Sequence, residues 1–224
     1  MCQLLFAPTE TGLLHHDRSE CLTRHTHREA FAAVVLRGGY VEAGDRGRIN
    51  VGPGDVVLHG PYESHQDHMT ASGAAVLILP WPEEKCWSPL GTVPDPDKLV
   101  RLAERDIKGA TRMLADEVSI RQLPPMDWPD ILARDLRVNP EVELRKWAET
   151  MGIRPETVSR GFRRAFGVSP QSFRAKVRLL QALPRIRRGE KLAQVATECG
   201  FADQAHLSRH FRMLTGGTPH AWRS

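Results

Sequence analysis

The chain has 224 residues, of which 41% are hydrophobic and 26% are charged, and its formal net charge is +4. This length suits one large domain or two modest ones, each with a core of its own. No stretch approaches the ~20 consecutive apolar residues that a membrane-spanning helix needs, and the four cysteines are dispersed without a C-x-x-C pair. These features argue against a membrane protein, a zinc knuckle and a disulfide framework, so we expect a cytoplasmic protein with reduced cysteines.

The charge is divided unevenly along the chain. Residues 1–120 carry 12 Lys and Arg against 17 Asp and Glu, a net of −5, whereas residues 121–224 carry 19 against 10, a net of +9. A basic half is typical of a module that binds phosphate groups, although a solvated basic face without function has the same composition. The division favours a nucleic-acid-binding C-terminal half joined to a domain of another kind.

Residues 20–80 have the pattern of β-structure. Apolar runs at Phe31–Leu36, Val56–Leu58 and Ala74–Leu79 are separated by stretches rich in glycine and proline. We predict that the first of these strands ends in a turn at Arg37–Tyr40, because two glycines lie there. Short strands at this spacing favour a small barrel or sandwich over a parallel sheet.

The pattern changes to that of helices in the middle of the chain. Apolar residues recur at spacings of three and four, with an aspartate at the start, which predicts one amphipathic helix over Pro96–Val118. A second, short helix is predicted over Trp128–Val138, and Asn139-Pro140 ends it.

Two similar segments, Leu144–Phe162 and Leu192–Phe211, close the chain. Each has a short helical pattern, a glycine, and then a helix that carries Ser-Arg on one side and apolar residues on the other. We expect the two glycines, Gly152 and Gly200, to take positive φ in a tight turn. One helix-turn-helix pattern is a weak signal, but two in tandem are a specific one.

Residues 140–223 resemble the DNA-binding domain of AraC/XylS transcriptional regulators. The markers that carry the resemblance are Phe166-Gly-Val-Ser-Pro170, Cys199-Gly-Phe-Ala-Asp-Gln204 and Ser208-Arg-His-Phe211. The sequence departs from the family at two positions. Arg154 stands where the family usually has a serine cap, so the first recognition helix loses a common cap. Pro184 predicts an early end or a kink in the helix that links the two units.

Seven of the ten histidines lie before residue 70. The stretch that begins with His25 and His27 resembles the first cupin motif, in which H-x-H is followed by a glutamate and a glycine. The glycine is Gly38, but Phe31 occupies the glutamate position. His65 stands where the second cupin motif has its ligand, so the resemblance implies an N-terminal cupin-like β-barrel.

The cupin resemblance also implies that His25, His27 and His65 converge inside the barrel. Three imidazoles could hold one divalent ion such as Zn²⁺, Fe²⁺ or Ni²⁺. Glu29 is expected on the same strand face as His25 and His27, which makes it the candidate for the missing carboxylate; weaker candidates are His59, His68 and Cys21. The alternative is that the histidines form the polar lining of an effector cavity with no metal bound.

The AraC resemblance places the recognition helices at Pro155–Phe166 and Asp203–Leu214, joined by a helix around Pro170–Leu183. The early residues of such a helix contact base edges in the major groove, where arginine can bridge guanine and glutamine can pair with adenine. The resemblance assigns base contacts to Glu156, Ser159, Arg160, Gln204, Ala205, Ser208 and Arg209.

Other arginines of the same half are expected on DNA phosphates, where they add affinity without reading sequence. These residues are Arg163, Arg164, Arg174, Arg185, Arg187, Arg188 and Arg212. For Arg160 and Arg209 the alternative to a DNA contact is a structural ion pair with a nearby carboxylate.

Together the patterns predict an α+β two-domain chain. It has a cupin-like sensor domain over 1–92, connecting or dimerisation helices over 93–138, and a DNA-binding domain with two helix-turn-helix units over 139–224. We expect a transcriptional regulator rather than an enzyme, which senses a small effector or metal ion and binds double-stranded DNA. A homodimer, and RNA polymerase in the case of an activator, are further expected partners. The alternative is a metal-dependent cupin enzyme, an oxygenase or isomerase, that carries a DNA-binding domain.

Overall fold

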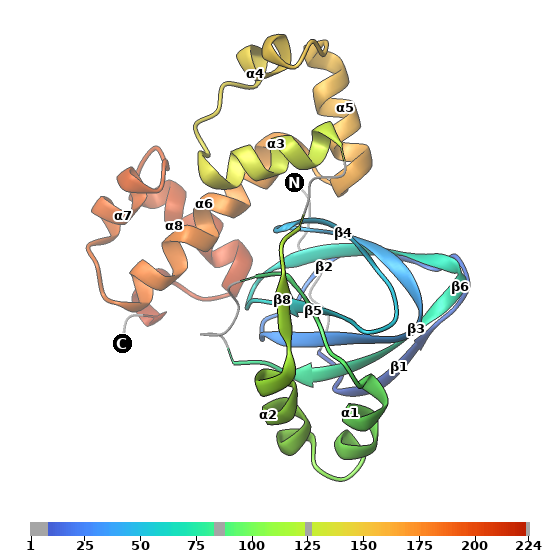
Figure 1. Ribbon diagram of the computed structural model, residues 1–224. Helices are drawn as coiled ribbons and strands as arrows, with labels where there is room; N and C mark the ends of the chain where they lie inside the picture. Colours follow the sequence, from blue (N-terminus) through green and yellow to red (C-terminus); the bar gives the residue numbers. More distant parts are fainter. Residues whose placement is uncertain (1–8, 83–87, 124–126, 223–224) are drawn as a thin grey trace. The chain divides into compact units, whose positions relative to one another are not determined.

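The computed structural model describes residues 9–82, 88–123 and 127–222, which form two compact units (Figure 1). The first, which we call the β unit, consists of residues 9–44 and 48–123, and the second, the helical unit, chiefly of residues 127–222. Within the region expected to connect the domains, 93–138, the first helices therefore belong to the β unit and the last helix to the helical unit. None of the described helices is long and apolar enough to cross a membrane.

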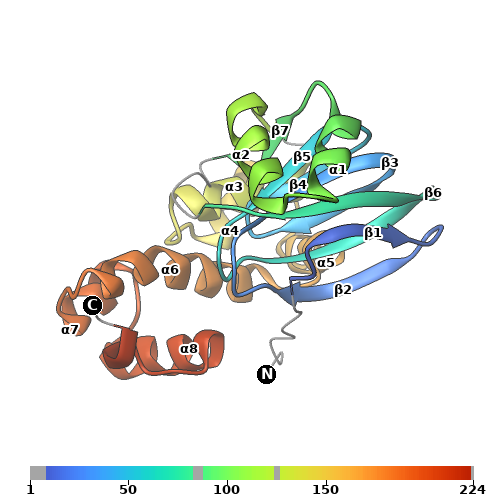
Figure 2. The ribbon, with the colours of Figure 1, turned by 90° about the horizontal axis from the view of Figure 1, so that it is seen from below.

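The described part of the β unit forms one eight-stranded sheet with the order β1-β6-β3-β5-β7-β8, in which β2 also pairs with β6 and β4 with β3. Two long antiparallel strands, β3 and β6, pair from Phe31 opposite Pro80 to Gly44 opposite His65. Figures 1 and 2 show these strands curving, so that the sheet folds over on itself. The strands are β1 Gly12–His16, β2 Cys21–Thr26, β3 Phe31–Gly44, β4 Gly47–Val51, β5 Asp55–His59, β6 Ser64–Pro80, β7 Leu90–Thr92 and β8 Ser119–Arg121.

The turn expected at Arg37–Tyr40 is wrong, because β3 runs through it to Gly44. The pairing of β3 with β6 instead shifts register between Val35 and Arg37 and again between Gly38 and Tyr40, as a β-bulge does. Gly38 has φ of 66°, and a Cβ on it would lie 1.9 Å from the carbonyl oxygen of Gly73. The glycine pair therefore permits close backbone approach within a long strand rather than a strand end.

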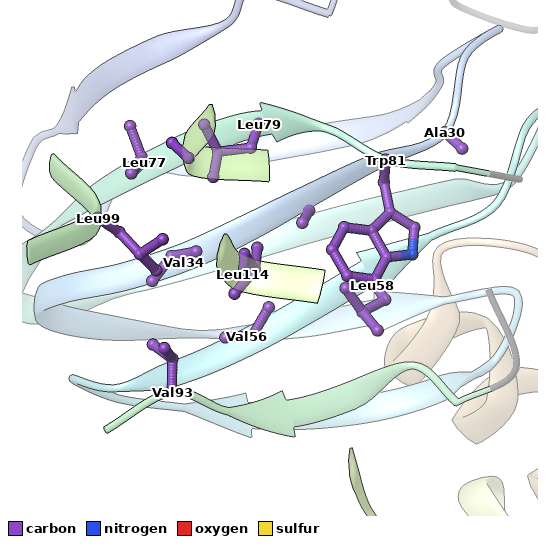
Figure 3. Packing of buried hydrophobic residues seen from close by; sticks show 12 residues of the cluster. Ala30, Val34, Val56, Leu58, Leu77, Leu79, Trp81, Val93, Leu99 and Leu114 are labelled. Atoms are coloured by element: carbon purple, nitrogen blue, oxygen red, sulfur yellow. The ribbon is translucent and has the colours of Figure 1, made fainter. Parts of the chain in front are cut away.

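Both faces of the sheet are buried, which explains the continuous apolar run in β3. Phe31, Ala33 and Val35 pack on one face, and Ala32 and Val34 on the other, as the two-residue period of a strand requires. Figure 3 shows the second of these cores, where side chains from two helices meet the strands. Its labelled residues are Ala30, Val34, Val56, Leu58, Leu77, Leu79, Trp81, Val93, Leu99 and Leu114.

The single helix predicted over Pro96–Val118 is wrong, because two helices, α1 (Pro96–Ala103) and α2 (Ile107–Glu117), replace it. Asp106 starts the second helix, since its side chain accepts a hydrogen bond from the Gly109 N–H at 2.8 Å. Leu99 of α1 and Leu114 of α2 are fully buried against the sheet. The apolar faces of both helices thus complete the core of the β unit.

The helical unit contains α3 (Trp128–Val138), which has the predicted bounds, and six further helical segments among the described residues. Figure 1 shows the long helix α6 with α4 and α5 near one end and α7 and α8 near the other. Of the two alternatives predicted at Pro184, an early end or a kink, the early end does not occur, since α6 continues through this residue to Arg187. The other segments are α4 Leu144–Thr150, α5 Pro155–Phe166, α6 Pro170–Arg187, α7 Leu192–Glu198, α8 Gln204–Thr215 and a 3-10 helix, Pro219–Trp222.

The cysteines that the structure describes are Cys21, which is exposed, and Cys199, which is buried. Both are free thiols. Cys2 and Cys86, which also entered the sequence argument, lie outside the described residues.

Candidate functional sites: two helix-turn-helix units and a histidine cavity

The two helix-turn-helix units share the same backbone geometry at their turns. In the first, the carbonyl of Ala148 accepts the N–H of Ile153 at 2.9 Å, and in the second the carbonyl of Ala196 accepts the N–H of Phe201 at 2.8 Å. The turn glycines have φ of 65° at residue 152 and 73° at residue 200. The prediction of positive φ at both glycines is confirmed, and it explains why a side chain is unfavourable there.

The two recognition helices, α5 and α8, begin in different ways. Arg154 at the N-cap of α5 makes no side-chain capping bond, which confirms the missing cap, and Pro155 provides the first helical residue. Asp203 is the N-cap of α8 and not its first residue, because its side chain accepts the N–H of His206 at 2.6 Å. Both helices end at a glycine in the left-handed conformation.

Each recognition helix buries an apolar face and exposes a polar one. The buried residues are Val158, Phe162 and Phe166 in α5, and Leu207, Phe211 and Leu214 in α8. All the residues expected to contact DNA in these helices lie outside the buried faces. They are Glu156, Ser159, Arg160, Arg163, Arg164, Gln204, Ala205, Arg209 and Arg212, which are exposed, and Ser208, which is half-buried.

The arginines of the recognition helices differ from those of the linking helix. Within residues 9–82, 88–123 and 127–222, Arg160 and Arg209 form no ion pair with a carboxylate, so the structural alternative for them has no support in the structure. Arg185, by contrast, is paired with both Glu190 and Glu198. The exposed arginines of α5 and α8 are therefore available to a ligand, whereas Arg185 of α6 is paired within the chain.

Three more of the arginines expected on phosphates have partners inside the helical unit. Arg174 donates to the carbonyl oxygen of Val142, and Arg188 donates to Glu190 at 3.0 Å. The guanidinium of Arg187 lies over the Trp222 ring, 5.2 Å from its centroid. These three side chains thus have partners within the helical unit, which the charge pattern of the sequence could not distinguish from phosphate binding.

Helix α3 supports the first unit, which the sequence interpretation did not anticipate. A Cβ on Gly161, in the middle of α5, would lie 2.4 Å from the ring of Trp128. The indole N–H of Trp147 in α4 donates to Asp135 of α3 at 2.9 Å. The glycine on a helix interior, where it is unfavourable, was the available sign of this close packing.

The β unit contains a cavity of about 280 Å³ lined by histidines and apolar side chains. His25 of β2 pairs in register with His65 of β6, and His27 follows the end of β2. The ring centroids of His25 and His65 are 4.3 Å apart, and those of His25 and His27 are 4.8 Å apart. One ligand atom from each of the three residues lies within 4.8 Å of the others, so the structure brings the three predicted histidines together.

Hydrogen bonds hold one nitrogen of each of these rings. Nδ1 of His25 is 2.9 Å from the carbonyl oxygen of Thr23 and that of His27 is 3.2 Å from the Thr9 hydroxyl. Nδ1 of His65 is 3.2 Å from an Asp67 oxygen. Metal-binding histidines are typically oriented in this way, since an acceptor at Nδ1 leaves the lone pair of Nε2 for the ion. Nε2 of His65 is buried without a hydrogen-bond partner among the described residues.

The surroundings give the three imidazoles different charge states. Burial lowers the pKa of His25, and it lowers the pKa of His27 to about 3, so both are neutral near pH 7. Burial acts in the same direction on His65, but the carboxylates of Asp67 and Glu42 outweigh it and raise its pKa to about 9. A cation that binds His65 therefore has to displace a proton.

Glu29 is not part of this cluster, contrary to its expected place beside His25 and His27. Strand β2 ends at Thr26, and Glu29 lies exposed in the bend that follows. Phe31, at the position of the missing glutamate, packs its ring against His59 at 4.2 Å between centroids. The weaker candidates Cys21 and His68 are exposed outside the cluster.

The carboxylate that does lie beside the histidines belongs to Glu42. This residue of β3 is 4% exposed, and its Oε2 is 3.3 Å from Nε2 of His59 and 3.6 Å from Nδ1 of His65. The sequence analysis did not identify Glu42, because the predicted strand ended in a turn at Arg37–Tyr40. Had the strand been extended to Gly44, Glu42 would have been a candidate.

Comparison with known proteins matches the C-terminal part of the chain. A family of helix-turn-helix domains matches residues 147–224. The HTH-type transcriptional regulator RipA of Corynebacterium glutamicum is 32% identical over 110 residues, which cover 48% of this chain and 33% of that protein. The HTH-type transcriptional activator RhaS of Pectobacterium carotovorum is 29% identical over 84 residues, 37% of this chain and 30% of that protein. The chain thus spans about a third of the length of these relatives.

Among solved structures, a probable AraC family transcriptional regulator from Rhodopseudomonas palustris is 24% identical. The match covers 42% of this chain and 94% of that one, with a TM-score of 0.38. The family match runs from Trp147 in α4 to residue 224, so it includes both turns and both recognition helices described above. Residues 147–224 therefore match a family of helix-turn-helix domains, and the two relatives found by sequence are HTH-type transcriptional regulators.

Proposed function

We propose that the chain is a cytoplasmic, DNA-binding transcriptional regulator whose β unit senses a small effector or a divalent metal ion. The observation that carries the proposal is the pair of recognition helices, whose outward arginines have no carboxylate partner among the described residues. An exposed guanidinium on such a helix is suited to guanine or to a phosphate. A second copy of the chain and, for an activator, RNA polymerase are the further partners of the regulator proposed.

The linking helix supports a bipartite DNA site. Helix α6 has 18 residues, which at about 1.5 Å per residue is a length of roughly 27 Å. Recognition helices that enter successive major grooves on one face of DNA lie about 34 Å apart. The two units are thus joined by a rigid element of suitable length, and one chain would read two different half-sites.

The sensing part of the proposal rests on the histidine cavity. In its metal form, His25, His27 and His65 hold one Zn²⁺, Fe²⁺ or Ni²⁺ ion, and their bonded Nδ1 atoms and converging rings support this. In its metal-free form the same histidines form hydrogen bonds with a small organic effector. The apolar part of the effector lies against cavity residues such as Leu14, Leu22 and Met69.

Salt-dependent binding of the full chain to duplex DNA tests the regulator proposal. We expect fluorescence anisotropy to show an affinity that falls steeply between 50 and 200 mM salt, as for proteins that displace several counterions. Arg160→Ala combined with Arg209→Ala should weaken binding at least tenfold. Arg101→Ala combined with Arg105→Ala removes two exposed arginines of the β unit and serves as the control of equal charge. Affinity that does not change with salt, or an equal effect of the control, would contradict the proposal.

Elemental analysis of the purified, tag-free protein distinguishes the two sensing forms. The metal form predicts about one ion per chain and its loss when His25 and His27 are both changed to alanine. His68→Ala is the control, because His68 is an exposed residue of β6. No metal in any of the proteins, even after incubation with Zn²⁺, Fe²⁺ or Ni²⁺, would exclude the metal form and leave the organic effector.

A further inference from the structure

Three side chains from different strands meet beside the histidine cluster. Glu42 of β3, His59 of β5 and His65 of β6 each offer a ligand atom within 4.8 Å of the other two. Their side chains are 5%, 5% and 8% exposed, so all three are deeply buried. Because β3, β5 and β6 are neighbours in the sheet, the arrangement is fixed by the strand pairing and not by a loop.

The polar groups of this set are incompletely bonded. Oε2 of Glu42 and Nε2 of His65 have no hydrogen-bond partner among the described residues, although both are buried. The pairing of β3 with β6 also puts Glu42 directly opposite Asp67, another buried acidic residue. Buried carboxyl groups are costly unless they are paired or coordinate a metal. The imidazoles of His59 and His65 lie at ion-pair distance from Glu42, at 3.3 and 3.6 Å, and a cation bound between them would coordinate the oxygen that no hydrogen bond satisfies.

The chemistry of this set differs from that of the first histidine group. His25, His27 and His65 are three nitrogen ligands, which suit ions such as Ni²⁺ and Zn²⁺. Glu42, His59 and His65 are two imidazoles and one carboxylate, a composition typical of sites that leave coordination positions open, and carboxylates favour Mn²⁺. The two groups have His65 in common.

We propose that Glu42, His59 and His65 form a second cation position in the cavity, which takes Mn²⁺-like ions and shares His65 with the His25–His27 position. One chain then holds one ion at a time, at a position that depends on the ion. The inference rests on the proposed function only in requiring that a divalent ion enters the cavity. It adds that the cavity discriminates between ions by the residues that hold them.

Titration calorimetry of the full chain with Mn²⁺ and with Ni²⁺ tests this inference, with electron paramagnetic resonance as a second readout for bound Mn²⁺. We expect Glu42→Gln to weaken Mn²⁺ binding at least tenfold and to leave Ni²⁺ binding within about threefold. Changing His25 and His27 together to alanine should have the opposite effect. His65→Ala should weaken both ions, and the exposed His68→Ala neither.

Each other outcome has a definite meaning. Glu42→Gln with normal Mn²⁺ binding overturns the second position while the metal form of the proposed function stands. If Glu42→Gln and the His25 and His27 double variant each weaken both ions equally, the cavity has a single site and the inference is also overturned. If the wild-type chain binds neither ion, the metal form of the proposed function fails together with this inference. His59→Gln repeats the test at another residue of the set, should Glu42→Gln not retain the thermal unfolding transition of the wild type.

Discussion

Because the two recognition helices begin differently, substitutions at their equivalent N-cap positions, Asp203 and Arg154, should change the stability of the protein in opposite directions. Asp203→Ala removes the bond that Asp203 accepts from the His206 N–H, and loss of such a cap costs about 0.5–2 kcal/mol. It also removes an anion from a helix N-terminus, worth about 0.3–1 kcal/mol. We expect a total loss near 1.5 kcal/mol, which for a domain of this size lowers Tm by roughly 6–12 °C.

The reciprocal change, Arg154→Asp, should stabilise the first recognition helix. The backbone of Arg154 is already extended, with φ of −66° and ψ of 136°, which is the conformation of a capping residue. The new carboxylate would accept a helical N–H and replace a cation near the positive end of the helix. We expect a gain of about 1 kcal/mol and a Tm higher by roughly 4–8 °C.

Scanning calorimetry of the full chain without DNA measures both effects. Asp203→Asn should fall between the wild type and Asp203→Ala, since an amide oxygen keeps the bond and loses the charge. Asp116→Ala, an exposed aspartate late in α2, should stay within about 0.5 kcal/mol of the wild type. An unchanged Tm for Asp203→Ala, or a lowered one for Arg154→Asp, would refute the reasoning.

Three more predictions follow from burial and exposure. Gly38→Ala should lower the free energy of unfolding by more than about 2 kcal/mol in urea denaturation, because its Cβ would lie 1.9 Å from a backbone oxygen of the paired strand; a wild-type midpoint would show that the strands can separate there. Leu99→Ala should lower the free energy of unfolding by about 2–5 kcal/mol. Ile120→Ala, at a side chain that is 53% exposed, should lower it by less than about 0.5 kcal/mol, and equal losses for the two variants would contradict the described core. On a preferred DNA site Arg209→Ala should make the free energy of DNA binding less favourable by about 1–3 kcal/mol and relax the preference for one base. Arg212→Ala should weaken binding to all sequences and reduce the slope of log affinity against log salt by about 0.9. Equal effects of the two variants in fluorescence anisotropy would contradict these assignments.

The elements that sequence predicted most accurately are those with local start and stop signals. Helix α5 has the predicted bounds because Pro155 fixes its first residue and Gly167 ends it in the left-handed conformation. The repetition of the same pattern around Gly200 made the second unit equally clear. The bounds of its recognition helix differ from the prediction by one residue at each end, because Asp203 caps the helix from outside and the helix continues to Thr215.

The features that sequence could not provide depend on pairing between distant residues. Whether β3 ends at Arg37 or runs on to Gly44 is decided by the strands beside it, since Gly38 fits against Gly73 of β6 and Gly39 against Val51 of β4. The longer β3 brings Glu42 to the histidines, whereas Glu29 is exposed because β2 ends at Thr26. The break between α1 and α2 was hidden for a related reason, since Asp106 fits the helical period and yet serves as a cap.

Selection of binding sites from a random duplex library with the full chain tests the account's central claim most directly. The account predicts enrichment of an asymmetric sequence with two different conserved segments about one helical turn apart, one of which is lost with Arg160→Ala and the other with Arg209→Ala. No enriched sequence, or one short segment that both variants still select, would contradict a regulator that reads DNA through two helix-turn-helix units.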